Sequence, residues 1–150
     1  LSSILTEAEY LLRTEIDRTG ITFTAAAFTT PIEIHTHQVQ LEQAFTNILR
    51  NAIHAVEEVT APEVRVTVVK CQDQVEIHVS DNGPGLAGAS LTDLQEPFFS
   101  TKPSGVGMGL GLAIATEIIK DHGGEIRLGR TDIGAEFIVT LPLPRAGDLE

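Results

Sequence analysis

The sequence predicts an α+β fold, a two-layer sandwich in which three helices cover one face of a mixed five-stranded sheet. The first observation is the order of the predicted elements: helix, strands, helix, two strands, a long irregular segment, helix, two strands. Helices and strands do not alternate one for one, which argues against a doubly wound parallel sheet. The second observation is size and composition. The chain has 150 residues, 42% of them hydrophobic, which predicts a single domain over residues 1–150.

Three segments carry the spacing of amphipathic helices, with apolar residues every three or four positions. The first covers residues 3–18 and is followed by Gly20, a residue type that commonly ends helices. The second covers residues 37–58, before Pro62, and the third covers residues 108–121. The apolar stripes of the first two helices are Leu5, Ala8, Leu12 and Ile16, then Leu41, Ala44, Phe45, Ile48, Ala52, Ala55 and Val56.

Two segments alternate between apolar and polar side chains, at residues 64–68 and 75–81, which is typical of strands with one buried face. Further strands are predicted at residues 21–28, 32–35, 125–128 and 135–141. Residues 82–107 are instead rich in glycine, proline and polar residues, and a helical turn is predicted only at 91–95. A long irregular segment in a compact domain is usually a binding loop or a lid.

The chain carries a formal net charge of −11. This argues against nonspecific nucleic-acid binding, which depends on clustered lysine and arginine. Any phosphate site must therefore be built locally, from backbone N–H groups, a metal ion or a few basic side chains. No apolar run approaches the length of about 20 residues that crosses a membrane, and a single cysteine, Cys71, fits a reducing compartment. We expect a cytoplasmic location without membrane insertion of this domain.

A carboxylate on an apolar strand face is the first candidate site feature. The odd-numbered residues of the strand 75–81 form its apolar face, and Asp81 falls on that face at the strand's end. A carboxylate there is unfavourable unless a group donates a hydrogen bond to it. Gly83 and Gly85 follow and would allow backbone to approach a flat ligand closely. The alternative is a tight turn, because Asp-Asn-Gly-Pro is a strong turn sequence.

Two asparagines on the second helix form another candidate feature. Asn47 and Asn51 are four residues apart, so they share one face of the helix, next to its apolar stripe. Their amide oxygens could ligate one hard cation, and Mg²⁺ accepts such ligands together with phosphate oxygens and water. The alternative is a pair of hydrogen-bonded core asparagines.

A glycine-rich segment, residues 105–112, leads into the third helix. Alternating glycines free backbone N–H groups to face phosphate, and the helix N-terminus adds the positive end of its dipole. The chain contains no Gly-Lys-Ser/Thr, so this is not a Walker loop. It is not the dinucleotide-binding fingerprint either, because Leu112 stands where the third glycine should be. Alone, such a segment is a weak signal for phosphate binding.

Taken in order, these motifs resemble those of the catalytic, ATP-binding domain of sensor histidine kinases. The helix segment Gln43-xxx-Asn47-xxx-Asn51-Ala52-xx-Ala55 resembles the N box of that family. The other matches are Asp81-x-Gly83-x-Gly85 with the first glycine box, Glu96-Pro97-Phe98-Phe99 with the F box, Gly107-x-Gly109-Leu110-Gly111-Leu112 with the second glycine box, and Gly134-Ala135-x-Phe137 with Leu141-Pro142 as the closing strand. The resemblance covers nearly the whole chain. It implies the Bergerat ATP-binding fold, shared with type II topoisomerases, mismatch-repair ATPases and a heat-shock chaperone.

The resemblance implies ATP and Mg²⁺ as ligands and assigns roles by position. Asp81 would accept a hydrogen bond from the adenine amino group, and Asn51 would ligate Mg²⁺ with Asn47 assisting. Lys102 would meet a phosphate from the lid or remain a solvated lysine, and His54 would contact a phosphate. Asn47, Asn51 and Lys102 would thus be the catalytic positions. The other implied positions of the nucleotide site are Gly83, Gly85, Thr101, Gly107, Met108, Gly109, Leu110 and Gly111, with Phe98 and Phe99 anchoring the lid.

Two details refine the resemblance. The run 97–103 resembles the short-lidded kinases of nitrogen, oxygen and dicarboxylate sensing. In the topoisomerase and chaperone members, a glutamate four residues before the metal asparagine activates water. Here that position is Asn47, which cannot act as a base, so slow hydrolysis and phosphoryl transfer to a protein are expected. Such transfer depends mainly on positioning and charge neutralisation.

The phosphate acceptor implied by the resemblance is a helical histidine followed by an acidic residue. None of the five histidines here precedes Asp or Glu, so the acceptor is expected on a separate dimerisation domain of a longer protein. A membrane-anchored and an unanchored parent protein are both compatible with this domain. A response regulator would be the further partner. The alternatives are a protein-serine kinase of the same fold, of the anti-sigma type, and a nucleotide-binding module without catalysis.

Overall fold

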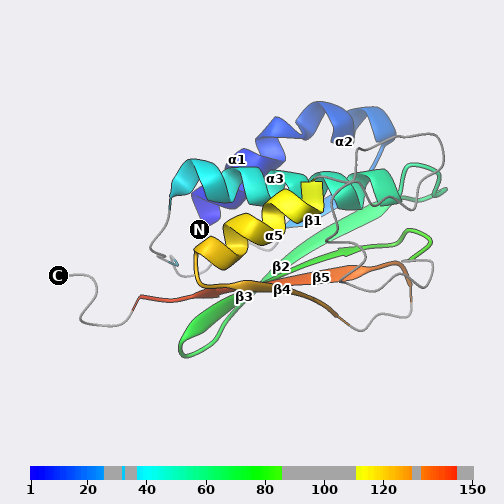
Figure 1. The fold of residues 1–150 in the computed structure, drawn as a ribbon. Coiled ribbons are helices and arrows are strands. Elements are labelled where there is room, and N and C mark those ends of the chain that lie inside the picture. Colours follow the sequence, from blue (N-terminus) through cyan, green and yellow to red (C-terminus); the bar gives the residue numbers. More distant parts are fainter. Residues whose placement is uncertain (26–31, 33–36, 86–110, 130–132, 145–150) are drawn as a thin grey trace.

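The structure is a computed structural model that describes residues 1–25, 32, 37–85, 111–129 and 133–144. It confirms the predicted α+β sandwich. The described helices lie together on one face of the sheet (Figure 1). They are α1 (Ser2–Leu11), α2 (Arg13–Thr19), α3 (Gln38–Ala55) and α5 (Gly111–Asp121), and the strands are β1 (Thr22–Ala25), β2 (Glu63–Lys70), β3 (Gln74–Asp81), β4 (Glu125–Leu128) and β5 (Glu136–Pro142).

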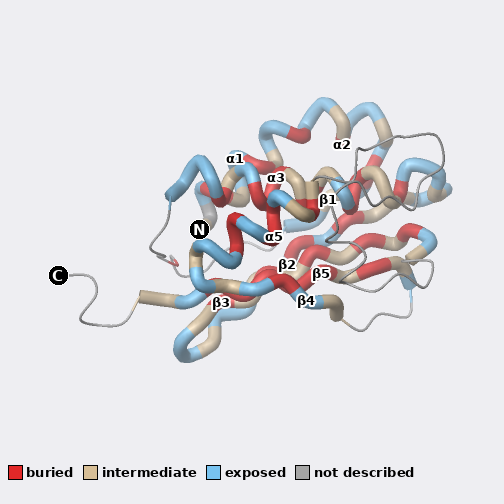
Figure 2. The backbone as a smooth tube through the Cα atoms, in the orientation of Figure 1, coloured by how far each residue is buried: buried red, intermediate tan, exposed pale blue. Residues whose placement is uncertain are grey.

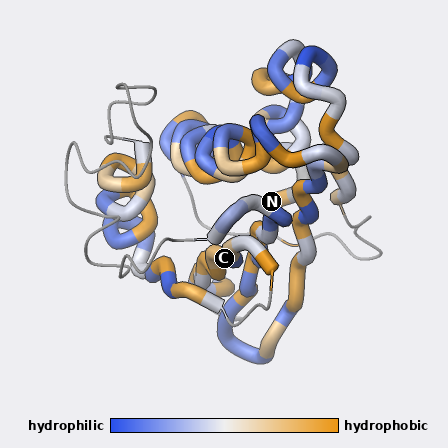
Figure 3. Tube along the Cα trace, turned by 90° about the vertical axis from the view of Figure 1, so that its right-hand side faces the viewer, coloured by the Kyte–Doolittle hydropathy of each residue, from blue (hydrophilic) through white to orange (hydrophobic). Residues whose placement is uncertain are grey.

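The five-stranded sheet has the order β1-β2-β3-β5-β4. The β1–β2 pair is parallel and the other three pairs are antiparallel, so the sheet is mixed, as predicted. Hydrophobic and hydrophilic positions are both spread along the chain (Figure 3), and β5 is buried at five consecutive positions. Along β3, burial instead alternates strictly from Gln74 to Asp81. This alternation gives β3 one face for the core, and Asp81 lies at the end of that face.

The first predicted helix is interrupted, so the described residues hold four helices where the sequence predicted three. Leu12, with φ −102° and ψ 3°, separates α1 from α2. The buried residues of this segment are Ile4, Ala8, Leu12 and Ile16. A spacing of four drifts by about 40° per step on a helix of 3.6 residues per turn. The interruption at Leu12 corrects that drift and keeps all four side chains on the core.

The other predicted strands and helix ends can be compared with the structure only where residues are described. Ile32 is buried but lies in no strand, which contradicts the predicted short strand at that residue. The rest of that strand at 33–35, the strand end at 26–28, the helical turn at 91–95 and the helix start at 108–110 lie outside the described residues. No described helix combines the length and apolar character needed to cross a membrane.

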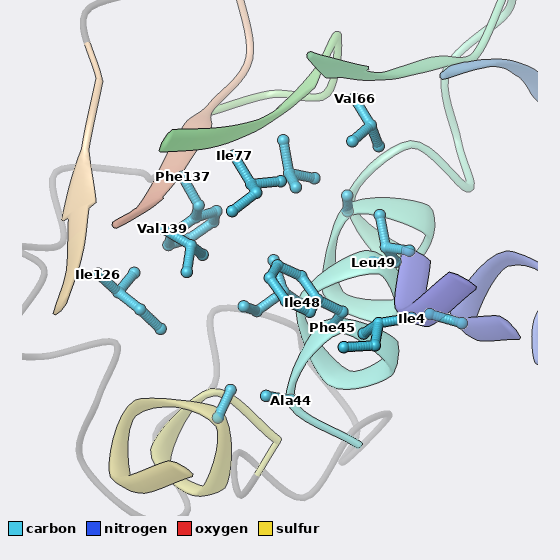
Figure 4. Packing of buried hydrophobic residues seen from close by; sticks show 14 of the residues in the cluster. Ile4, Ala44, Phe45, Ile48, Leu49, Val66, Ile77, Ile126, Phe137 and Val139 are labelled. Atoms are coloured by element: carbon cyan, nitrogen blue, oxygen red, sulfur yellow. The ribbon is translucent and has the colours of Figure 1, made fainter. Parts of the chain in front are cut away.

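The core lies between the helices and the sheet, where buried residues gather (Figure 2). Phe45 and Ile48 of α3 point toward Ile77 of β3 and toward Phe137 and Val139 of β5 (Figure 4). All five side chains are almost completely buried. Burying each large apolar side chain stabilises the fold by about 1.5–3 kcal/mol. This packing therefore fixes α3 over the centre of the sheet. The polar face of α3 is thereby held beside the end of β3.

Candidate functional site

The candidate site is built on the polar row of α3. Asn47 is half-buried and Asn51 is exposed, so the alternative of two core asparagines does not hold for Asn51. The first residue of α5 lies directly against this row. A Cβ built on Gly111 would lie 3.7 Å from the Cβ of Asn47 and 4.0 Å from its Oδ1. The first residue of α5, at the positive end of the helix dipole, therefore lies beside Asn47.

The end of β3 meets the same row one turn further along. A Cβ on Gly83 would lie 2.5 Å from the Ala55 carbonyl oxygen, so only glycine allows this approach of the two backbones. Asn47 and Ala55 are eight residues apart, about 12 Å along a helix axis. Asn51 lies between them. The row thus connects the start of α5 with the end of β3 across a distance that a base, a ribose and phosphates can span.

Asp81 is the buried acidic group of the site, with only 7% of its surface exposed. Its Oδ1 accepts a hydrogen bond of 2.9 Å from the Gly83 backbone N–H. Burial raises the pKa of the Asp81 carboxyl above its usual value of 3.8, and the backbone N–H groups of Gly83 and Ala135 partly offset this. A buried acceptor of this kind prefers a partner that donates a hydrogen bond, such as an amino group.

Gly134 forms a wall of the site that sequence reasoning did not assign. Its φ is +73°, and a Cβ there would lie 1.9 Å from the Asp81 carbonyl oxygen and 2.9 Å from Asp81 Oδ1. Gly85, whose φ is +84°, lies next to Gly134, because a Cβ built on Gly85 would be 3.4 Å from the Gly134 carbonyl oxygen. The sequence marked Gly134 only as part of the motif at residues 134–137. That Gly134 lies against Asp81 is a tertiary contact, which the motif does not reveal.

Asn82 is a second residue that sequence reasoning missed. Its side chain donates to the Ala61 carbonyl at 2.7 Å and accepts from the Glu63 backbone N–H at 2.8 Å. Its own N–H donates to the Glu63 carbonyl at 3.2 Å. These bonds tie the end of β3 to the start of β2 and so hold Asp81 and Gly83 in place. The preference of asparagine for turns was visible in the sequence, whereas its partners were not.

His54 lies next to the asparagine row but faces acidic groups. Its Nε2 is 3.8 Å from Glu15 Oε2 on α2 and 4.0 Å from Glu57 Oε1. Arg50, one turn earlier, lies with Nε 3.5 Å from Glu15 Oε1. The basic groups of this part of α3 are therefore held by α2.

The remaining predicted site residues lie outside the described residues: Phe98, Phe99, Thr101, Lys102, Gly107, Met108, Gly109 and Leu110. The described part provides a buried carboxylate, two amides on one helix face and a helix N-terminus, in that spatial order. Amide oxygens are suitable ligands for Mg²⁺, and the exposed position of Asn51 leaves its side chain accessible to an ion. Asn47 and Asn51 therefore fit a metal that also binds phosphate.

Comparisons with known proteins find one protein family over most of the chain. Residues 36–145 match the family model described as "Histidine kinase-, DNA gyrase B-, and HSP90-like ATPase". The C4-dicarboxylate transport sensor protein DctB of Pseudomonas aeruginosa is 39% identical over 101 residues, which cover 66% of this chain and 16% of that protein. The chain spans 12% of the length of the two-component sensor PprA of Pseudomonas aeruginosa and 34% of the length of the sensory histidine kinase/phosphatase NtrB of Rhizobium leguminosarum.

Solved structures resemble nearly the whole chain. The catalytic domain of the histidine kinase ThkA is 28% identical with a TM-score of 0.81, covering 95% of this chain and 94% of that one. Full-length ShkA, solved in complex with AMPPNP, is 28% identical with a TM-score of 0.80, covering 96% of this chain and 30% of that one.

Proposed function

Because the chain belongs to the histidine kinase-, DNA gyrase B- and HSP90-like ATPase family, we propose that it binds MgATP and transfers the γ-phosphate to a histidine on a separate dimerisation domain. The single observation that carries this proposal is the order of groups along α3. The buried Asp81, the pair Asn47 and Asn51, and the start of α5 at Gly111 follow one another at one edge of the sandwich.

Adenine recognition falls to Asp81. Its carboxylate accepts from the exocyclic amino group of the base, and the glycines at 83 and 134 leave room for backbone to lie close to it. Guanine presents a carbonyl oxygen at that position, which would face the carboxylate as a second acceptor. The site therefore prefers ATP to GTP.

Metal and phosphate binding fall to the asparagine row. Asn51 and Asn47 would hold Mg²⁺, which neutralises phosphate charge when bound. The N–H groups at the start of α5 face the same space and add their dipole. The chain has a formal charge of −11, which repels the nucleotide phosphates at long range. These local groups overcome that repulsion.

No carboxylate occupies the position from which the ATP-hydrolysing relatives activate water, because residue 47 is asparagine. Glu42 lies on the first turns of α3, where it accepts a hydrogen bond of 2.9 Å from Gln38. It is more than one turn from Asn47 and does not replace the missing base. The residues of this site hold and orient the nucleotide, and the nucleophile comes from the acceptor domain.

The parent protein is proposed to act in a two-component system, with a response regulator as the further partner. The test uses the purified domain, the acceptor domain of the same protein and MgATP. Acid-labile phosphohistidine on the acceptor domain is expected. Acid-stable phosphoserine would favour the anti-sigma type of kinase, and nucleotide binding without transfer would favour the non-catalytic module.

Replacing Asn51 by alanine tests the metal role. The variant should lose most of the Mg²⁺-dependent part of ATP binding, on the order of tenfold for one lost ligand, while magnesium-free binding changes little. Calorimetric titration with ATP, in the presence and absence of Mg²⁺, measures both. Gln40→Ala, an exposed change near the start of α3 and outside the N box, is the control. An Asn51→Ala variant with normal phosphotransfer would contradict the assignment.

A further inference from the structure

The contact between α2 and α3 holds a positive charge beside the proposed metal residues. Glu15 of α2 lies between Arg50 and His54, with Oε1 3.5 Å from Arg50 Nε and Oε2 3.8 Å from His54 Nε2. All three side chains are partly exposed. The two basic residues are four apart on α3, so a single carboxylate bridges them.

These contacts are electrostatic rather than well-formed hydrogen bonds. Both distances exceed the usual donor–acceptor range for nitrogen and oxygen. Glu15 Oε2 is buried and has no hydrogen-bond partner among the described residues. A carboxylate oxygen that is buried without a donor is unfavourable. Glu15 therefore holds its two basic neighbours loosely.

Arg50 and His54 also lie beside the asparagine row. At 100° per residue, His54 and Arg50 fall about 20° and 60° to one side of Asn47 around the axis of α3, and Asn51 falls about 40° to the other side. The two basic residues therefore lie on the side of Asn47 that faces α2, and the closer site residue to Arg50 is Asn47. A side chain as long as that of Arg50 can swing from Glu15 toward a group bound over Asn47, because the side chain is partly exposed.

Resting on the proposed function, we infer that Arg50 is a phosphate-binding residue of the nucleotide site and that Glu15 competes with the nucleotide phosphates for it. A phosphate offers the guanidinium paired, charge-assisted hydrogen bonds, whereas Glu15 offers one contact of 3.5 Å. Nucleotide binding then breaks the bridge between α2 and α3. By linkage, loosening that bridge strengthens nucleotide binding.

Three variants test the competition: Glu15→Gln, Arg50→Gln and the control Asp17→Asn. Asp17 lies on the same helix, is exposed, and pairs with Arg13 at 3.8 Å instead of with α3, so its variant removes an equal charge. Binding of ADP and of adenosine is measured by calorimetry in Mg²⁺, because only ADP carries phosphates.

Glu15→Gln is expected to tighten ADP binding about two- to fivefold, the range of a partly exposed ion pair. Arg50→Gln is expected to weaken ADP binding about tenfold, the range of one lost hydrogen bond between charged groups. Adenosine binding should be unchanged in both, and Asp17→Asn should change ADP binding less than Glu15→Gln does. In the Arg50→Gln background, the effect of Glu15→Gln should shrink.

The inference is overturned if Glu15→Gln weakens ADP binding or leaves it unchanged, or if adenosine responds as ADP does. It is also overturned if Asp17→Asn reproduces the gain. These results leave the proposed function intact as long as the unmodified domain binds MgATP. If the unmodified domain binds no nucleotide, the proposed function and the inference fail together.

Discussion

Replacing Gly134 by alanine should abolish measurable nucleotide binding and destabilise the domain by at least about 2 kcal/mol. The added Cβ would lie 1.9 Å from the Asp81 carbonyl oxygen and 2.9 Å from its Oδ1. Backbone must move to relieve this overlap, because the closest atom belongs to the main chain of β3. The residue also has a φ of +73°, which L side chains rarely adopt. Asp81 would be displaced from its position beside the Gly83 N–H.

Gly20→Ala separates the two causes of this effect. Gly20 has a similar φ of +69°, but a Cβ there would meet nothing within 4 Å. This control therefore carries the backbone strain alone, about 1–2 kcal/mol, and keeps nucleotide binding. Thermal denaturation and ATP titration of both variants measure the difference. Equal loss of stability in the two variants, with ATP binding retained in Gly134→Ala, would show that Gly134 is not a wall of the site.

Replacing Asp81 by asparagine should have opposite effects on binding and on stability. ATP affinity should fall by about 1.5–3 kcal/mol, the worth of a hydrogen bond to a charged group, or roughly 10- to 100-fold. The nucleotide-free variant should nevertheless be more stable at neutral pH. Burial raises the pKa of Asp81, so the ionised carboxylate costs stability, while an asparagine oxygen still accepts the Gly83 N–H bond.

The sign of the pH dependence follows from that raised pKa. The protonated group contributes stability that is fully present below its ordinary value of 3.8 and is lost as the pH rises through the higher folded-state value. The stability advantage of Asp81→Asn over the parent should therefore grow from about pH 4 upward and level off once Asp81 is fully ionised in the folded protein. Asp73→Asn, at an exposed carboxylate in the β2–β3 turn, should show no such gain.

Chemical denaturation across this pH range measures the stability difference, and calorimetry measures binding of ATP and GTP. The parent should prefer ATP, and Asp81→Asn should lose that preference. Unchanged ATP affinity in the variant would remove Asp81 from the base site. A lower stability of the variant at neutral pH would contradict the buried-charge argument alone.

Much of the fold was predictable because its signals are local. The alternation along β3 predicted that Asp81 falls on the apolar face, and it is buried there. The apolar stripe of the helix over residues 37–58 predicted α3 within three residues at either end. The break at Leu12 was not predicted, since apolar residues every three or four positions, at Leu5, Ala8, Leu12 and Ile16, are also compatible with one continuous helix.

The candidate site was predictable only in part. The motifs identified Asp81, Asn47 and Asn51, since residue type and spacing express what each position can do chemically. Gly134 and Asn82 were missed as site residues because their roles consist of contacts with β3 and β2. His54 was predicted as a phosphate contact, but its proximity to Glu15 could not be read from two separate helices.

The sequence by itself determined the class of fold, the faces on which Asp81, Asn47 and Asn51 lie, and the types of side chain available to the candidate site. Those properties follow from the backbone repeat of a helix or strand, which acts over a few residues. Only the tertiary structure decided which distant segments meet: Gly134 with Asp81, Gly111 with Asn47, and Glu15 with Arg50. Such contacts depend on how the whole core packs. The close packing of α3 on the sheet sets the distances between residues of α3, residues of the strands and the segments attached to them.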